Sequence, residues 1–417
     1  MDALMNFVQT ILNMGAVAIL PIMIFILGVI FRMKVGDALR SGLMVGIGFQ
    51  GLSLVINLLM STMQPALDYY QKMGTGYTTA DLGWATVGAA SWTVPFAAIF
   101  IPLAFLLNVI MIRMKWTKVM NVDIWNFIHM LIPGALAYAL FGSTVLGIIV
   151  ALIMAVVAIK FGERLAPEWQ EFFGLDGTTC STASYVLWYP IFQLMDKLYD
   201  HIPGLKSANV NIDNLTDKVG VFGEPCFMGI VIGLFLGLLT RQSVTVIIPM
   251  CIGFGAVLVL IPRMVAVMME GITPLGNAAN EFMKKWTGND DELIIGMDVC
   301  LGLGDPTVIV CTAICIPVAI TTAFVLPNMH FFPVGMLSGI CYAMVMPALA
   351  HRGNFIRTLI TGILFVYFCA WAANFFTPEA TMMMSVTGMK IKGQVTDTFF
   401  GLSLMNVLLE VIHRIII

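Results

Sequence analysis

Charged residues are scarce in this chain of 417 residues. Asp, Glu, Lys and Arg make up 11% of the sequence, hydrophobic residues make up 59%, and the mean hydropathy is +0.93. Because soluble domains carry roughly 25% charged residues, this composition argues against a soluble enzyme and predicts an integral membrane protein. Apolar runs such as 96–112, 145–159 and 244–261 approach the ~20 residues with which a helix crosses the hydrocarbon layer, so we expect an all-α membrane fold.

Signatures of catalytic and metal-binding proteins are also missing. The sequence holds no H-E-x-x-H, no G-x-S-x-G and no Walker A loop, which argues against a membrane-embedded hydrolase. Its eight cysteines show no C-x-x-C pair and no Cys/His ligand spacing. Cys311 and Cys315 share a helical face, but a zinc site would need further donors. We therefore expect no metal, no cofactor, no disulfide framework and no nucleic-acid partner.

Landmarks of the first half recur in the second half in the same order. Pseudo-symmetric halves with Gly and Pro inside apolar segments are typical of transporters whose central site opens alternately to each side. Chance similarity between Gly-rich apolar helices is the alternative interpretation. The paired landmarks are Pro21 and Pro225, Gly28 and Gly233, Ile47-Gly48-Phe49 and Ile252-Gly253-Phe254, and Ile101-Pro102 and Ile316-Pro317.

The basic residues predict how the chain crosses the membrane. Lys and Arg in short loops stay on the cytoplasmic side, so the first loop, with Arg32, Lys34 and Arg40, places the N-terminus outside. Arg241, Lys390 and Lys392 do not fit the resulting path, whereas most other basic residues do. We expect about eleven transmembrane helices in two inverted repeats with re-entrant or broken helices, and a cytoplasmic C-terminus. The predicted parts are a first membrane repeat (1–167), a connector (168–221), a second, inverted repeat (222–380) and a C-terminal span (381–417).

The connector lies in the most polar stretch of the chain. It mixes acidic residues such as Glu168 and Asp196 with aromatic residues such as Trp169 and Trp188, and it is too polar to span. We expect an amphipathic helix at the cytoplasmic face that leads into a partly buried re-entrant segment at 177–184. A flexible linker is the alternative, although the aromatic residues argue against disorder.

Ionisable residues in apolar surroundings mark candidate sites. Glu224 directly precedes Pro225 at the start of a span, where a carboxylate either caps the helix or contacts a substrate. Asp298 and Asp305 flank a Gly-rich segment that ends in Pro306. We interpret this segment as a broken helix whose exposed backbone groups, together with Asp298, hold hydroxyl groups.

Two further segments have the composition of a sugar or polyol site. Trp125 and His129 share one helical face, and an aromatic ring beside hydrogen-bonding groups suits a molecule with C–H faces and hydroxyls. An interfacial anchor and a satisfied core histidine are the structural alternatives. Ser91 and Trp92 lie in a segment interrupted by Gly83 and Pro95, which corresponds through the repeat to the Asp298 segment. Paired breaks of this kind point to a binding site.

Five short motifs follow one another along nearly the whole chain. They are Met-Lys-Val-Gly-Asp at 33–37, Gly-Ile-Gly-Phe at 46–49, Asn-Val-Asp-Ile-Trp-Asn at 121–126, Phe-Gly-Glu-Pro at 222–225 and His-Arg-Gly-Asn at 351–354. In this combination and order they resemble the galactitol-type enzyme IIC permease of the bacterial phosphotransferase system, in the ascorbate/galactitol superfamily.

This resemblance implies a transport subunit of the bacterial inner membrane that is not an enzyme on its own. A polyol, galactitol or similar, would be carried across by movement of a core domain against a scaffold in a homodimer, as in an elevator. A separate IIB subunit bearing a phosphocysteine would phosphorylate it at the cytoplasmic face, and IIA would also be separate. The resemblance implies substrate contacts at Ser91, Trp92, His129, Ser181, Thr182 and Asp298, and gating or site-organising roles for Glu224, Asp123, Asn126 and Asp305.

The chain departs from the family pattern at three places. Val299 stands where galactitol permeases have Pro, Asp305 stands where His is common, and Cys-Ser-Thr-Ala-Ser at 180–184 replaces the usual His-Gly-Thr-Ser. These departures leave the identity of the polyol open. An ion-coupled polyol or sugar symporter is the alternative hypothesis, in which Asp298, Asp305 and Glu224 would be ion ligands.

Overall fold

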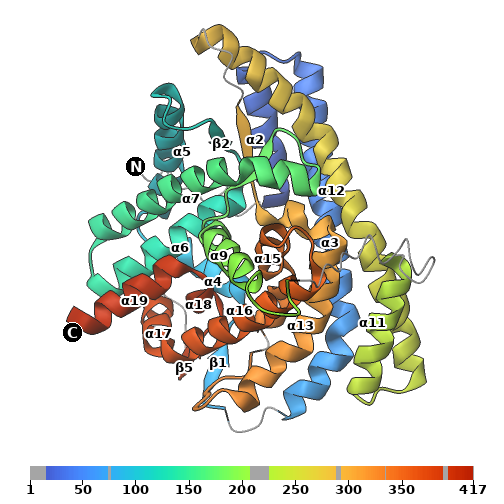
Figure 1. The fold of residues 1–417 in the computed structure, drawn as a ribbon. Helices are drawn as coiled ribbons and strands as arrows, with labels where there is room; N and C mark the ends of the chain where they lie inside the picture. Colours follow the sequence, from blue (N-terminus) through green and yellow to red (C-terminus); the bar gives the residue numbers. More distant parts are fainter. Residues whose placement is uncertain are drawn as a thin grey trace.

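The computed structural model describes residues 16–73, 77–206, 225–287, 293–333, 335–387 and 393–416. Within these ranges the chain is mostly helical, and its strands form two short parallel sheets (Figure 1). The expected all-α membrane architecture is confirmed in its main features. Five helical stretches are long and apolar enough to cross a membrane: Val35–Ala66, Thr144–Phe173, Val244–Ala279, Pro306–Val325 and Phe355–Phe375.

Shorter apolar helices supply further candidate spans. Those of the described residues are Leu20–Ile30, Ile99–Arg113, Trp125–Phe141, Gly229–Leu239 and Ile340–Ala350. None of the candidate spans found in the described ranges falls between 381 and 417. The last helix there, α19 (Leu404–Ile416), has 13 residues and buries the polar side chains of Asn406, Glu410 and His413. The eleventh span therefore stays a prediction.

Two long and two shorter helices form what we call the scaffold. They are α2 (Ala16–Ile30), α3 (Val35–Met73), α11 (Pro225–Leu239) and α12 (Val244–Thr287). Helix α2 packs on α3, α11 packs on α12, and α3 packs against α12; α3, α11 and α12 lie on the right in Figure 1.

The scaffold helices α3 and α12 approach closely because the repeated Ile-Gly-Phe triplets place a glycine at each contact. A Cβ on Gly48 would lie 2.4 Å from the Met268 side chain, and one on Gly253 would lie 2.3 Å from the Thr62 hydroxyl. Glycine leaves room for the facing helix at both positions.

The remaining elements form what we call the core domain. Local signals set its helix ends: the Asp123 carboxylate accepts from the Trp125 N–H to cap α6, which ends at Gly142 with φ 65°, and α7 ends at Gly174 with φ 66°. Its longer helices are α5 (Ala97–Arg113), α6 (Ile124–Phe141), α7 (Thr144–Phe173), α13 (Pro306–Val325) and α16 (Phe355–Phe375). Its shorter ones are α4 (Trp84–Ser91), α14 (Ile340–Ala343), α15 (Val345–Ala350), α17 (Thr377–Val386), α19 and the 3₁₀ helix η3 (Gly335–Ser338).

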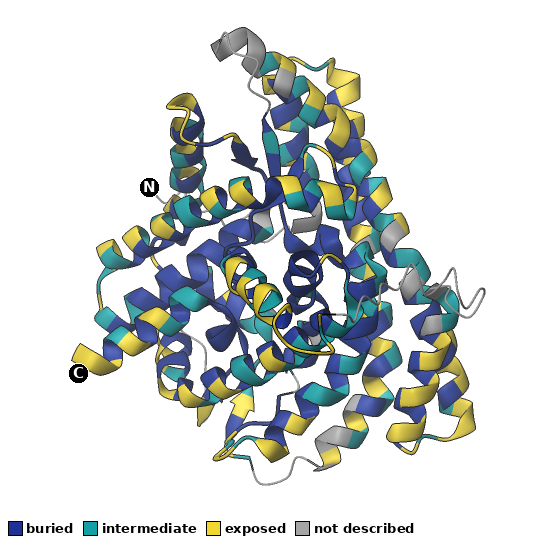
Figure 2. Ribbon diagram, in the orientation of Figure 1, coloured by how far each residue is buried: buried dark blue, intermediate teal, exposed yellow. Residues whose placement is uncertain are grey.

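Exposed apolar residues cover the outer surface of both parts. Figure 2 shows buried residues at the centre of the fold and exposed residues on the outward faces of its helices. In water a surface so rich in large apolar side chains would drive association; in a bilayer these side chains face lipid. Examples are Ile47, Val145, Leu238 and Ile252, each at least 60% exposed.

Two small parallel sheets lie inside the core domain, and the sequence analysis did not predict them. One joins β2 (Val119–Asn121), β4 (Ile294–Met297) and β3 (Thr178–Cys180) in that order; the other joins β1 (Thr79–Asp81) and β5 (Gln394–Thr396). Strands of three or four residues are too short to show an alternating pattern. The chain turns into a helix soon after β3, β4 and β5, at α8 (Ala183–Val186), η2 (Val299–Gly304, a 3₁₀ helix) and α18 (Phe399–Leu402).

The predicted connector is an ordered part of the core domain in its described residues. Helix α7 continues to Phe173, past the boundary expected at 167, and residues 178–184 are buried in β3 and the start of α8. The amphipathic helix α9 (Tyr189–Tyr199) follows this segment, whereas the sequence analysis placed an amphipathic helix before it.

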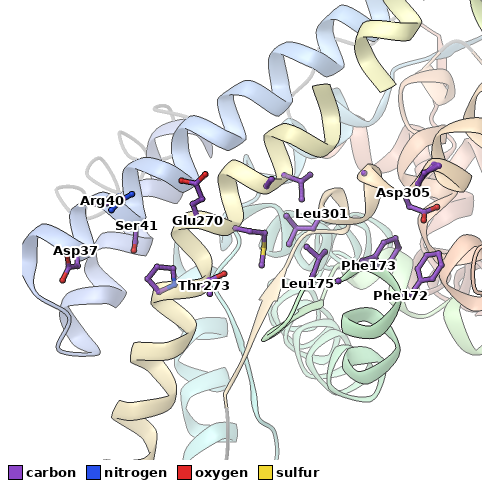
Figure 3. Close-up of a pocket in the computed structure, with 17 residues that line it drawn as sticks. Asp37, Arg40, Ser41, Phe172, Phe173, Leu175, Glu270, Thr273, Leu301 and Asp305 are labelled. Atoms are coloured by element: carbon purple, nitrogen blue, oxygen red, sulfur yellow. The ribbon is translucent and has the colours of Figure 1, made fainter. Parts of the chain in front are cut away.

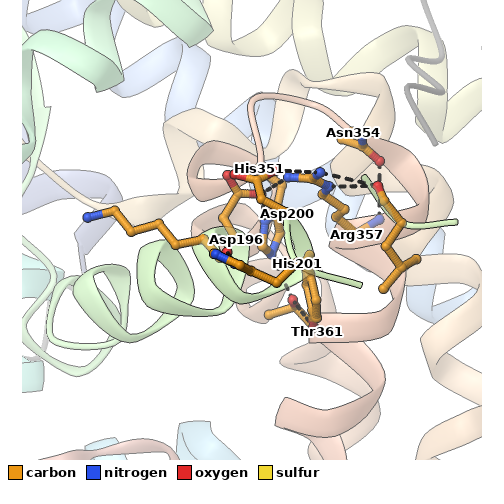
Figure 4. A network of polar contacts seen from close by, with 10 residues as sticks. Asp196, Asp200, His201, His351, Asn354, Arg357 and Thr361 are labelled. Atoms are coloured by element: carbon orange, nitrogen blue, oxygen red, sulfur yellow. Dashed lines mark hydrogen bonds and ion pairs between the residues drawn. The ribbon is translucent and has the colours of Figure 1, made fainter. Parts of the chain in front are cut away.

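A cluster of ion pairs holds α9 against α16 (Figure 4). The Arg357 guanidinium donates to the carboxylates of Asp196 and Asp200 at 2.9 and 2.8 Å, and the His351 Nδ1 lies 2.7 Å from the same Asp196 oxygen. Burial lowers the pKa of His351 below its usual value, although the neighbouring Asp196 acts in the opposite direction.

Candidate functional site

Two cavities lie between the scaffold and the core domain, on either side of η2. The larger, of about 920 Å³, is bordered by Asp37, Arg40 and Glu270 of the scaffold and by Asp305 of the core domain (Figure 3). The smaller, of about 390 Å³, is lined by Asp298, Val299 and Cys300, whereas the larger is lined by Leu301, Gly304 and Asp305 of the same segment. We take the smaller cavity as the candidate site, because aromatic rings and fixed hydrogen-bonding groups converge there.

Aromatic rings form a continuous wall of the smaller cavity. The ring centroids of Trp84 and Trp125 are 5.2 Å apart, and the His129 ring stacks on Trp84 at 5.3 Å. Phe49 of the scaffold extends the wall, 6.2 Å from Trp125, and Phe399 lies 5.4 Å from His129. The buried indole N–H of Trp84 has no hydrogen-bond partner among the described residues. The wall thus offers apolar faces to a ligand.

Asp298 is a carboxylate of this site that hydrogen bonds hold in place. It follows β4 directly, and its Oδ1 accepts from the Cys300 N–H at 2.9 Å. Its own backbone N–H donates to the Asp123 carboxylate at 3.2 Å. Its Oδ2 lies 3.1 Å from the Thr182 hydroxyl. These contacts fix the orientation of Asp298 before any ligand arrives.

A buried polar network lies behind Asp298. The Asn126 amide donates to Asn121 Oδ1 at 2.7 Å and to Ser181 Oγ at 2.9 Å. The Thr182 hydroxyl also lies 2.8 Å from Asn126 Oδ1 and accepts from the Val299 N–H at 2.8 Å. Ser181, Thr182, Asp123 and Asn126 therefore lie around Asp298 and do not line the cavity. For Ser181 and Thr182 this differs from the substrate contacts expected from the sequence.

His129 lines the same cavity as Asp298. Its Nδ1 is hydrogen-bonded to the Ser184 hydroxyl, and its ring packs between Trp84, Tyr185 and Phe399. Because Nδ1 is engaged by Ser184, the other ring nitrogen remains for a ligand. The structure thus brings together His129 and Asp298, two of the six predicted substrate contacts.

The other sequence candidates lie elsewhere. Ser91 is buried and donates to the Gly88 carbonyl at 2.7 Å, and Trp92 is half-buried at the far end of α4 from Trp84. Asp305 borders the larger cavity and caps α13 by accepting from the Val308 N–H at 3.1 Å. Glu224 lies outside the described residues.

The sequence analysis missed several cavity residues. Three of them, Phe49, Ser53 and Asn57, line the cavity from one side of α3. Their spacing of four residues is typical of one helix face, so the sequence could have indicated that they act together. Trp84 directly follows the Gly83 that was already singled out. Asp397 also lines the cavity, after β5. Without knowledge of β5, nothing in the sequence around Asp397 indicated that this residue lies at the cavity.

Comparison with known proteins gives consistent matches over most of the chain. A family model described as EIIC-GAT, PTS system sugar-specific permease component, matches residues 10–394. The galactitol-specific EIIC component of the PTS system of Escherichia coli strain K12 is 34% identical over 365 residues, 87% of this chain and 81% of the relative. A putative permease IIC component of the same strain is 31% identical over 385 residues, 92% and 88% of the two chains.

Proposed function

Since the chain belongs to the galactitol-type EIIC family of phosphotransferase-system permeases, we propose that it binds a polyol in the cavity beside Asp298 and carries it inward for phosphorylation. Membership confirms the family predicted from the motifs and makes the chain a multi-pass permease component of the inner membrane. The observation that carries the proposal is the cavity itself. Its 390 Å³ fall within the ~300–1,000 Å³ typical of small-molecule sites.

The lining of the cavity suits a neutral molecule with many hydroxyl groups. A carboxylate accepts several hydroxyl hydrogen bonds at once, and Asp298 is already oriented to do so. His129 adds a further polar contact, and Trp84 and Trp125 offer faces for the C–H groups of the carbon chain. Galactitol or a related polyol has both kinds of surface.

We assign the transfer of the phosphoryl group to other subunits. The substrate would be phosphorylated at the cytoplasmic face by a separate IIB, itself supplied by IIA, while this chain acts as the transport subunit. In this proposal the larger cavity, beside Arg40 and near the basic first loop, is the cytoplasmic vestibule. The N-terminus then lies outside and the C-terminus inside. Glu224 remains a proposed gate on sequence grounds alone.

The core domain would move against the scaffold of a homodimer, and the two halves of the chain would be inverted repeats of an eleven-span protein. Two sets of contacts support the repeats. Thr178 pairs with Ile295 and Gln394 with Thr79 in parallel register, and one shift of 216 residues relates both pairs (178 to 394, 79 to 295). The scaffold contacts show the same relation to within one residue. Gly48 contacts Met268 in the second half, and its counterpart Gly253 contacts Thr62 in the first half.

Uptake of a labelled polyol panel into vesicles tests this function. Vesicles holding the chain are compared with and without phosphorylated IIB inside, and the chemical form of the accumulated label is determined. We expect accumulation as the polyol phosphate only with phosphorylated IIB. Free polyol concentrated by an ion gradient without IIB would contradict the proposal and establish the symporter alternative.

A further inference from the structure

The end of the chain repeats the geometry that positions the polar network behind Asp298. Strand β3 and helix α8 at 178–186 correspond residue by residue to β5 and α18 at 394–402. The partner strands also correspond, because β3 pairs with β4 in the same register as β5 pairs with β1. Asp397 and Thr398 therefore occupy the places that Ser181 and Thr182 occupy in the first unit.

The side chains that meet at the strand ends differ between the two units. In the first unit, the Thr182 hydroxyl contacts Asp298, which follows the partner strand. In the second, Asp397 directly follows β5, and Asp81 is the last residue of the partner strand β1. Burial and the neighbouring Asp397 carboxyl group raise the pKa of Asp81.

Backbone groups fix this carboxyl pair. Asp81 accepts from the Gly335 N–H at 2.8 Å and from the Gly83 N–H at 3.3 Å. A Cβ on Gly335 would lie 2.5 Å from the Asp81 carboxylate, so glycine is needed for this approach. Asp397 accepts from the Phe399 N–H at 2.8 Å and is 1% exposed. Asp397 lines the smaller cavity, whereas Asp81 lies behind it.

The two units reach the cavity from different sheets. Strands β1 and β5 lie at the lower edge of the core domain in Figure 1, and β2 lies at its upper edge. Asp298 and Asp397 line one cavity nevertheless, together with the aromatic wall between the sheets. A ligand in this cavity therefore meets one carboxylate from each of the two sheets.

We propose that Asp397 is a second substrate-contacting carboxylate, which accepts hydroxyl groups from the end of the polyol that lies away from Asp298, and that Asp81 is a positioning residue that fixes it. This inference rests on the proposed polyol function. It also narrows the substrate class, because a site with one carboxylate for each end selects a linear polyol with free hydroxyl groups at both ends.

Equilibrium binding to the purified full-length protein tests the inference. The probes are a labelled hexitol and its terminal-deoxy analogue, and the variants are Asp397→Asn, Asp298→Asn and the control Asp176→Asn, an exposed carboxylate outside both cavities. Asn at 397 keeps the acceptor for the Phe399 N–H, so α18 should remain capped. We expect Asp397→Asn to weaken hexitol binding about tenfold or more, the effect of one charge-assisted hydrogen bond, and Asp176→Asn to change nothing.

The analogue separates one-ended from two-ended recognition. Wild-type protein should bind the terminal-deoxy polyol more weakly than the hexitol, because either orientation leaves one carboxylate without its hydroxyl. In Asp397→Asn the hexitol and its deoxy analogue should bind with equal affinity, because the analogue can place its deoxy end beside residue 397, where the carboxylate has been removed. Wild-type affinity for the hexitol in Asp397→Asn, or an unchanged difference between the ligands, would overturn the inference while the proposed function stands.

Binding to single and double variants tests the positioning role of Asp81 separately. Asp81→Asn should weaken hexitol binding, yet adding it to Asp397→Asn should cause no further loss, because Asp81 acts through Asp397. Additive losses in the double variant would contradict this role. If wild-type protein binds no polyol of a panel of pentitols and hexitols while Asp298→Asn is equally inactive, the proposed function falls and the inference with it.

Discussion

The two sides of the candidate site reach the same cavity with different chemistry. On the side of β4, the Asp298 carboxylate is held by a backbone N–H and the neutral Thr182 hydroxyl, and the Asp298 backbone N–H donates to Asp123. On the side of β5, Asp397 is paired with a second carboxyl group, Asp81. The strand register is the same on both sides. Duplicated backbone geometry can therefore carry two different sets of hydrogen-bonding groups, and both sets can bind a ligand that has hydroxyl groups at each end.

The largest effect should come from Asp298. Replacement by Asn removes the charge while its amide oxygen can still accept from the Cys300 N–H, and loss of the charge-assisted hydrogen bonds to the ligand should lower hexitol affinity by about 3 kcal/mol, roughly 100-fold. Binding to purified protein measures this, with Asp176→Asn as the matched control. His129→Ala should also abolish detectable binding. Both variants should still insert and elute as the wild type does, and wild-type binding in both would remove the site from this cavity.

The aromatic wall should contribute the next largest effect. Trp84→Ala removes a ring that touches Trp125 and His129, and loss of its buried contacts should weaken binding by about 1.5–3 kcal/mol. Trp92→Ala is the matched control, since Trp92 belongs to the same segment but does not line the cavity. A larger loss from Trp92→Ala than from Trp84→Ala would restore the substrate contact expected from the sequence.

The network behind Asp298 should have a smaller effect. Thr182→Val keeps the shape but removes the hydroxyl that contacts Asp298 and Asn126, so affinity should fall about tenfold. Thr398→Val is the corresponding change on the other side, where the carboxyl contact comes from Asp397, and its effect should be smaller. Equal losses in the two variants would mean that the two sides are chemically alike.

Stability of the scaffold provides a comparison within one helix pair. Gly253→Ala should lower the thermal unfolding midpoint, because the added methyl overlaps the Thr62 side chain and overpacking costs about 1–3 kcal/mol. Gly36→Ala in α3 is the control, since nothing lies within 4 Å of a Cβ there. An equal response of both variants would show that the α3–α12 contact is not tight.

The smallest effect should be the pH dependence contributed by His351. Burial lowers its pKa in the folded protein, so the unfolded chain binds the proton more readily below its unperturbed pKa of about 6.5. The contribution of the buried, neutral His351 to folding stability is therefore complete above that pH and is lost as the pH falls below it. Unfolding midpoints of wild type and His351→Asn at pH 8 and pH 5.5 measure this. A midpoint that rises on acidification would mean that pairing with Asp196 outweighs burial.

Features formed by long runs of neighbouring residues could be predicted from the sequence. Apolar runs predicted the membrane class, and the motif at 121–126 helped to predict the permease family to which the chain belongs. The sequence analysis placed Ser91 and Trp92 at the site because the repeat aligns their segment with Asp298; in the structure α4 contributes its first residue, Trp84, and not its last.

What could not be foreseen depends on contacts between distant segments. Strands of three or four residues carry too little pattern to be recognised, so neither sheet was expected. Asp397 could be connected to the site only after the β1–β5 register was known. The position of the amphipathic helix α9 was also missed, because the polar stretch 161–223 does not itself show where α7 ends.

The most direct test of the account is a structure of the protein with a saturating hexitol. We predict the ligand in the smaller cavity against Trp84 and Trp125, with hydroxyl groups of one end within hydrogen-bonding distance of Asp298 and of the other end within reach of Asp397. A hexitol bound instead in the larger cavity, beside Arg40 and Asp305, would contradict the assignment of the site.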